Sequence, residues 1–81
     1  MLTEYIAAAM KRAQYKIIED EAPYFGEIPG FPGVWSNAAT LEECRAELQE
    51  VLEGWLILKL RDGDDLPVLN GISLAPQHSP S

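Results

Sequence analysis

The spacing of hydrophobic positions predicts two helices with a group of short strands between them. Residues 4–13 are rich in alanine, which favours helix, and their apolar side chains recur three and four positions apart. Thr3 is a candidate N-cap for this first helix. Short runs of aromatic and β-branched residues follow, bounded by turn residues, at 15–18, 24–28 and 34–36. These runs predict an antiparallel meander of three strands.

The clearest helix start in the chain is at Thr40. Thr40 and Glu43 fit a capping box, in which the threonine hydroxyl accepts the Glu43 amide, and Gly63 is a natural C-terminal stop. Gly54 lies between them and indicates a close backbone approach in mid-helix. The apolar residues recur at threes and fours along one stripe: Leu41, Cys44, Leu48, Val51, Trp55 and Leu58. This stripe predicts a long helix packed on one face of the sheet, and residues 72–74 predict a short fourth strand.

The second half of the long helix is apolar around most of its circumference, from Trp55 to Leu60. A helix that is buried on one side only does not have this pattern. Either the domain covers this half on both sides, or a second subunit does. A chain of 81 residues has little material for covering both sides, which favours the subunit contact. The candidate residues of an oligomer interface are Trp55, Leu56, Ile57 and Leu60.

Two segments are candidates for binding another protein. Phe31 lies between two Pro-Gly pairs, at the tip of a rigid connection between strands, where an aromatic side chain can contact a partner. The acidic turn Glu19-Asp20-Glu21 can dock a basic protein. Tyr24 and Trp35 could also anchor an interface, but packing in the core is the favoured interpretation for both.

Composition narrows the function further. The net charge is −7, from thirteen acidic and six basic residues, which disfavours direct binding to nucleic acid or to anionic membranes. An acidic surface suits a basic protein partner, although it can also serve solubility alone. The N-terminus has no signal-peptide pattern, and no apolar run approaches the length of a membrane span. We expect a cytoplasmic single domain over residues 1–74 and a flexible tail over 75–81.

Candidate chemistry is sparse. Cys44 is the only cysteine and lies on the apolar stripe, where a thiol is inert, and His78 is the only histidine, in the tail. Neither has companions with metal-ligand spacing, so we expect no metal site and no cofactor. Glu19, Asp20, Glu21 and Glu27 could suggest a metal-dependent nuclease, but adjacent acids in a turn point in different directions. We therefore expect no catalytic residues and no enzymatic activity.

The segment from Tyr24 to Val34 (YFGEIPGFPGV), followed by Thr40-Leu41-Glu42-Glu43-Cys44 and a long helix, resembles the HicB-like antitoxin family. The resemblance extends from about residue 15 to residue 69. It implies a β-β-β-α-β domain with a partial ribonuclease H-like fold. It also implies a HicA-type toxin as partner, a small ribonuclease that cleaves mRNA and whose active surface the HicB domain covers.

Two departures from this family change the expected function. Only seven residues follow Leu74, too few for the DNA-binding segment that many members carry, so operator binding is not expected. The helix at residues 1–13 is an addition that resembles a solo-domain subgroup. We therefore expect a non-catalytic protein-binding module that occludes a HicA-type toxin and assembles as a dimer or tetramer. The alternatives are an orphan homo-oligomeric scaffold without a toxin and, less favoured, a weak metal-dependent nuclease.

Overall fold

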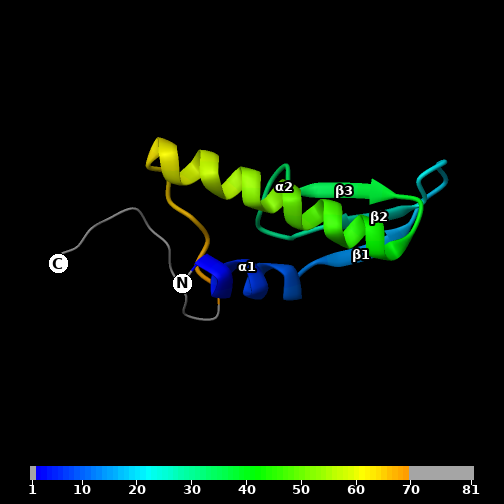
Figure 1. Cartoon of the computed structure of the whole chain (residues 1–81), viewed down its shortest axis with the longest axis horizontal. Coiled ribbons are helices and arrows are strands. Elements are labelled where there is room, and N and C mark those ends of the chain that lie inside the picture. Colours follow the sequence, from blue (N-terminus) through cyan, green and yellow to red (C-terminus); the bar gives the residue numbers. More distant parts are fainter. Residues whose placement is uncertain (1, 70–81) are drawn as a thin grey trace.

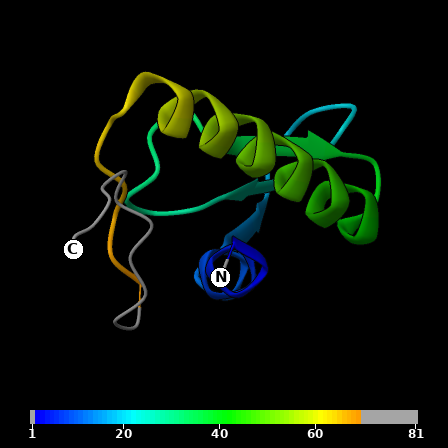
Figure 2. The same cartoon turned by 60° about the vertical axis from the view of Figure 1, so that its left-hand side comes forward.

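The computed structural model describes residues 2–69 and gives them an α+β fold. Its elements are α1 (Leu2–Lys11), β1 (Gln14–Ile17), β2 (Tyr24–Glu27), β3 (Trp35–Ala38) and α2 (Leu41–Asp62). The strands form one antiparallel sheet in the order β1-β2-β3, with α2 across one face, and α1 lies beside the C-terminal half of α2 (Figure 1 and Figure 2). The predicted helix–meander–helix order is confirmed. The predicted fourth strand at 72–74 and the tail at 75–81 lie outside the described residues.

Two consecutive turns shape the connection between β2 and β3. In each turn, proline occupies the second position and glycine the third, and Gly30 and Gly33 both have a φ of 87°. This geometry is that of a type II turn, which requires positive φ at its third position. The amide of Phe31 donates to the carbonyl of Ile28, and the amide of Val34 donates to that of Phe31, each at 3.1 Å. The first and last residues of both turns, Ile28, Phe31 and Val34, therefore point to one side, and all three are buried.

This turn pair explains why one prediction is wrong. Phe31 was expected to project outwards, but only 3% of it is exposed. Its ring centroid lies 6.3 Å from that of Tyr5 in α1 and 5.1 Å from that of Trp55 in α2. The two Pro-Gly pairs face solvent and turn the residue between them inwards. Phe31 thus joins α1 and α2 in the core.

The ends of α2 follow the sequence signals, whereas its buried face does not. The Thr40 hydroxyl accepts the Glu43 amide at 3.1 Å, and Gly63 ends the helix in the left-handed conformation. The buried residues recur every four positions: Cys44, Leu48, Leu52 and Leu56. The predicted members Leu41, Val51 and Leu58 are exposed instead. The apolar positions of α2 permit more than one stripe, and the sheet covers only one of them.

The first helix supplies the other half of the core. It begins at Leu2, so Thr3 lies within its first turn and is not the N-cap that was predicted. Tyr5, Ala8 and Ala9 face inwards, because the Tyr5 ring meets Phe31 and its hydroxyl donates to the carbonyl of Pro67. Small alanine side chains beside Tyr5 allow α1 to lie close to the core. This helix therefore fixes both the β2–β3 connection and the segment after α2.

Candidate protein-interaction surface

The sheet has one covered face and one open face. Across the strands, Tyr15 lies opposite Gly26, and Gly26 lies opposite Ser36. This row faces α2, since the Ser36 hydroxyl donates to the carbonyl of Cys44 at 2.8 Å. A Cβ atom added to Gly26 would lie 3.2 Å from the Cys44 sulfur and 2.8 Å from the Tyr15 ring. Glycine and serine at these positions let α2 pack closely on β2 and β3.

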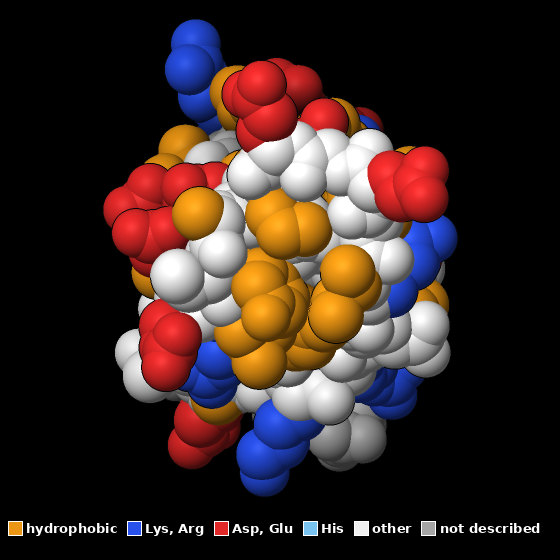
Figure 3. Space-filling model, turned by 90° about the vertical axis from the view of Figure 1, so that its right-hand side faces the viewer, with side chains coloured by type: hydrophobic (Ala, Val, Ile, Leu, Met, Phe, Trp, Pro, Cys, Tyr) orange, Lys and Arg blue, Asp and Glu red, His pale blue; other side chains and the backbone are white. Residues whose placement is uncertain are grey.

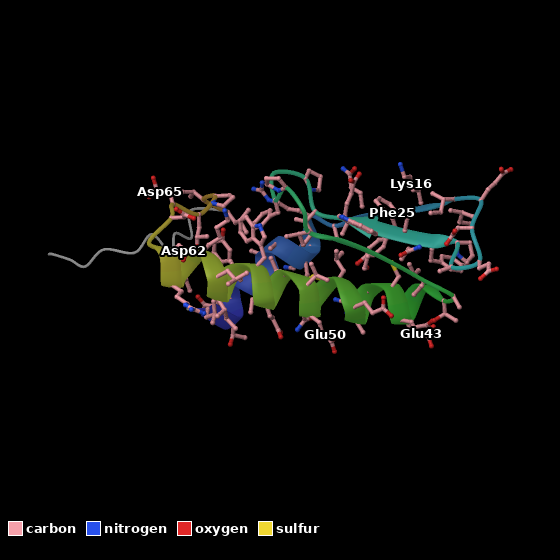
Figure 4. All side chains as sticks on the ribbon, turned by 90° about the horizontal axis from the view of Figure 1, so that it is seen from above. Lys16, Phe25, Glu43, Glu50, Asp62 and Asp65 are labelled. Atoms are coloured by element: carbon pink, nitrogen blue, oxygen red, sulfur yellow. The ribbon has the colours of Figure 1, made fainter. Side chains whose placement is uncertain are left out.

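The alternate positions point away from α2, and no described helix covers them. Figure 4 shows Lys16 and Phe25 on the side of the sheet opposite to Glu43 and Glu50 of α2. We call this surface the open face and define it by its five residues, Lys16, Phe25, Glu27, Trp35 and Asn37. Successive side chains alternate between the two faces of a strand, so these residues are neighbours across the pleated surface.

Two aromatic side chains form the centre of the open face. The rings of Phe25 and Trp35 are stacked, with centroids 5.8 Å apart and planes inclined by 25°. The Lys16 ammonium lies 5.2 Å from the centroid of Phe25, within the range of a cation–π contact. Trp35 is 52% exposed, so the interpretation of this residue as core is wrong. Trp35 projects outwards because its neighbour Ser36 occupies the position that faces α2.

The acidic turn is attached to the rim of this face. The Asn37 side-chain amide donates to the Asp20 carboxylate at 3.2 Å and to the carbonyl of Ala22 at 3.3 Å. The same carboxylate accepts the Ala22 amide at 3.0 Å. Asp20 is therefore held in place, while Glu19 and Glu21 beside it are exposed. The turn adds three negative charges at the edge of the aromatic centre.

A shallow hollow of about 410 Å³ adjoins the open face and is lined by residues 27–35. Glu27 and Trp35 belong to both surfaces, and the remainder of the lining comes from the two Pro-Gly turns. Glu27 is the one titratable side chain in this lining. A general acid–base pair or a cation site would need further groups aimed at the same point. The hollow therefore continues the open face onto the two Pro-Gly turns.

Other candidate chemistry is dispersed. Within residues 2–69, no group of three His, Cys, Asp or Glu side chains could hold a metal ion. Cys44 is fully buried, as predicted. Burial also raises the pKa of Tyr5 and the pKa of Tyr15 above the usual phenol value. Both phenols thus stay protonated at neutral pH. Neither described helix contains an apolar stretch long enough to cross a bilayer.

The predicted oligomer residues divide into two groups. Leu56 is 1% exposed and belongs to the core of its own chain, and Trp55 and Leu60 pack partly against that core. Ile57, in contrast, is 61% exposed. The chain's own core thus covers one side of this half of α2 and leaves Ile57 uncovered, and the contact with a second subunit stays a prediction. Hydrophobic side chains also gather at the end of the molecule that holds the β1–β2 turn and the start of α2 (Figure 3), where Ile17 and Leu41 are exposed.

The open face was only partly accessible to sequence reasoning. The acidic turn was proposed as a contact, whereas Phe25 was not considered, and Trp35 was weighed as an interface anchor but assigned to the core. A usable signal was present, because each aromatic residue is followed by a small one, Gly26 or Ser36, in strands of the same sheet. Small residues are required where a helix packs closely, which leaves the adjacent aromatic side chains on the other face.

Comparison with known proteins gives two findings. The model of the family described as UPF0150-like matches residues 4–67. The crystal structure of TTHA0281 from Thermus thermophilus is similar, with 47% sequence identity, a TM-score of 0.90 and coverage of 95% of each chain. No curated protein matches the sequence.

Proposed function

This chain belongs to the UPF0150-like family, and from that premise we propose that it is a cytoplasmic, non-catalytic protein-binding module of the HicB-like antitoxin type. Its sheet and long helix then correspond to a partial ribonuclease H-like domain. The module covers the basic catalytic surface of a small HicA-type toxin that cleaves mRNA. The observation that supports this function most directly is the exposed Phe25–Trp35 stack beside an acidic turn.

The aromatic stack has the properties of an interface centre. Binding energy in protein interfaces is concentrated in a few residues, among which tryptophan is enriched, that become fully desolvated. Trp35 is half exposed in the single chain and is held in one orientation by Phe25, so a partner gains apolar contact at a small cost in side-chain entropy. The Pro-Gly turns beside it add rigid, apolar surface. These features favour a preformed docking surface.

The charge of the surroundings favours a basic partner. Glu19, Asp20, Glu21 and Glu27 are exposed on or beside the open face, and Lys16 is the basic residue of that face. Complementary charge accelerates encounter and selects among partners more than it adds affinity. A ribonuclease that binds RNA presents cationic side chains at its active surface, and an acidic cover competes with the phosphates for them.

The test is a binding and inhibition assay with a HicA-type protein encoded beside the gene. Wild-type chain should bind the purified toxin and suppress its cleavage of RNA. Trp35→Ala should weaken binding by at least about 30-fold, as expected for a central interface residue that contributes about 2 kcal/mol or more. Val68→Ala is the matched control, because Val68 is similarly exposed but lies in the segment after α2.

Charge reversal in the acidic turn gives an independent measurement. Glu19→Lys with Glu21→Lys should lower the association rate and reduce its dependence on salt, with little change in the dissociation rate. Equal affinity of wild type and Trp35→Ala for the toxin would refute the open face as the docking surface. A HicA-type toxin that neither binds the wild-type chain nor loses activity would refute the antitoxin function.

The alternative of a homo-oligomeric scaffold without a toxin is favoured by a different observation. Ile57 and Leu58 are 61% and 57% exposed, next to each other on α2. Exposed apolar surface of this kind is typical of an interface between subunits. Recovery of a stable homo-oligomer that binds no toxin would support this alternative.

A further inference from the structure

The middle of α2 carries a glycine for which the single chain shows no use. A Cβ atom added at Gly54 would meet nothing within 4 Å. The predicted close approach to Gly54 is therefore absent among residues 2–69. Glycine in a helix interior lowers helix stability relative to alanine, so a contact outside the chain is the natural reason for its presence.

Exposed side chains surround Gly54 at helical spacing. Positions three, four and seven residues away lie on the same side of a helix. On both sides of Gly54 these positions are exposed. We call this surface the outer face of α2, and it consists of Glu47, Glu50, Val51, Gly54, Ile57, Leu58 and Arg61. It is opposite to the buried residues Cys44, Leu48, Leu52 and Leu56.

We propose that the outer face of α2 binds a second copy of this chain, with the two α2 helices antiparallel and crossing at Gly54. A two-fold axis through Gly54 places Val51 opposite the partner's Ile57, and Glu47 opposite the partner's Arg61. Val51 and Ile57 thus form an apolar contact and Glu47 and Arg61 an ion pair, while Glu50 lies opposite the partner's Leu58, about one helical turn from the partner's Arg61. Such self-complementarity is the requirement for an isologous dimer interface.

Charge selects this arrangement over a parallel one. In a parallel crossing, Glu47 would lie opposite the partner's Glu47, and Arg61 opposite the partner's Arg61, which is repulsive. Glu47 and Arg61 form no ion pair within residues 2–69, where Lys59–Asp64 is the one ion pair found. Both are therefore available to a second copy. A crossing angle of about 20° keeps them within reach at seven residues from the axis, and glycine at the crossing allows close approach of the two backbones.

The surroundings of the outer face fit this occupant. An apolar hollow of about 270 Å³ lies between α1 and α2, beside Ile57, and is lined by Leu2, Ile6 and Leu60 among others. It offers space for an apolar side chain of the second copy. Glu50 points away from the sheet, on the side opposite to Phe25 (Figure 4). The dimer therefore leaves the open face of each chain accessible, and this inference stands whether or not a toxin binds there.

Disulfide trapping tests the position of the two-fold axis. Gly54→Cys should form a covalent dimer under mild oxidation, since the two new thiols face each other across the axis. Ala46→Cys is the control, because the two copies of an exposed residue eight positions from the axis are about 24 Å apart along the helices. Cys44 is buried and should give little background. Equal cross-linking of the two variants would overturn the proposal.

Charge exchange tests the antiparallel register. Analytical ultracentrifugation should show that the wild-type chain dimerises. Glu47→Arg alone, or Arg61→Glu alone, should raise the dissociation constant of the dimer about tenfold. Each of these substitutions replaces two attractive charge pairs by two repulsive ones. The double variant restores both pairs in reverse and should return the constant to near the wild-type value. A monomeric wild type at millimolar concentration, or a double variant no better than the single ones, would overturn the proposal. Circular dichroism of all variants should match wild type, because the substituted residues are exposed.

Discussion

Phe31→Ala separates the structure from the simplest interpretation of the sequence. The sequence places Phe31 at a loop tip, where its removal would leave stability unchanged. The structure buries it between Tyr5 of α1 and Trp55 of α2. Removing the ring takes away the contact through which the β2–β3 connection holds both helices. We expect a large loss of stability.

The magnitude follows from burial and from the size of the chain. Truncating a buried phenylalanine to alanine costs about 3–5 kcal/mol, through lost transfer energy and the cavity left behind. A domain of 81 residues has a total unfolding free energy of about 4–12 kcal/mol. The substitution therefore removes between a quarter and all of the stability, and should lower Tm by at least about 12 °C. Phe31→Leu keeps most of the volume and should cost about 1–3 kcal/mol, partly from the lost aromatic contacts.

Urea denaturation followed by far-UV circular dichroism measures these values, with a stabilising osmolyte added if Phe31→Ala is largely unfolded in water. Trp35→Ala is the matched control. Its side chain is large and aromatic but half exposed, so it should cost about 0.5–1.5 kcal/mol, mainly from the stack with Phe25. A smaller cost for Phe31→Ala than for Trp35→Ala would refute the packing described above.

Three further predictions concern caps, glycines and pH. Gly30→Ala should lower the unfolding free energy by about 1 kcal/mol or more, because the φ of Gly30 is 87°. Gly54→Ala should raise the unfolding free energy of the isolated protomer by up to about 1 kcal/mol, because a Cβ atom there meets nothing within 4 Å. Thermal melts at low protein concentration measure both changes. Thr40→Ala should lower the unfolding free energy by about 0.5–2 kcal/mol, since the Glu43 amide loses its acceptor, and Thr40→Ser should restore most of it. Burial raises the pKa of Tyr5. The protonated Tyr5 side chain therefore contributes its full stabilisation below about pH 10, and this contribution is lost as the pH rises further. Above about pH 10, the difference in unfolding free energy between wild type and Tyr5→Phe should shrink.

Some features follow from local sequence alone because their causes act over a few residues. Thr40 and Gly63 set the ends of α2 through hydrogen bonds and backbone angles within one turn. The alternation of strand and turn residues determines the meander, to within one or two residues at the strand ends. The candidate acidic turn is likewise a local feature, and the structure places it as an exposed turn at the rim of the open face.

The choice of faces was decided by tertiary packing. Residues 41–60 contain apolar side chains on several sides, and only contact with the sheet selects the stripe that includes Leu52 and Leu56. Phe31 was expected to be exposed and Trp35 buried, and tertiary packing is also the reason why the structure shows the reverse. Two turns in sequence carry Phe31 inwards, and the close packing of α2 on Gly26 and Ser36 leaves Trp35 on the opposite face. Capping and turn signals act through the neighbouring backbone, so the sequence alone determined the helices and strands. Burial depends on contacts between segments tens of residues apart, so only the tertiary structure decided which side chains remain available to a partner.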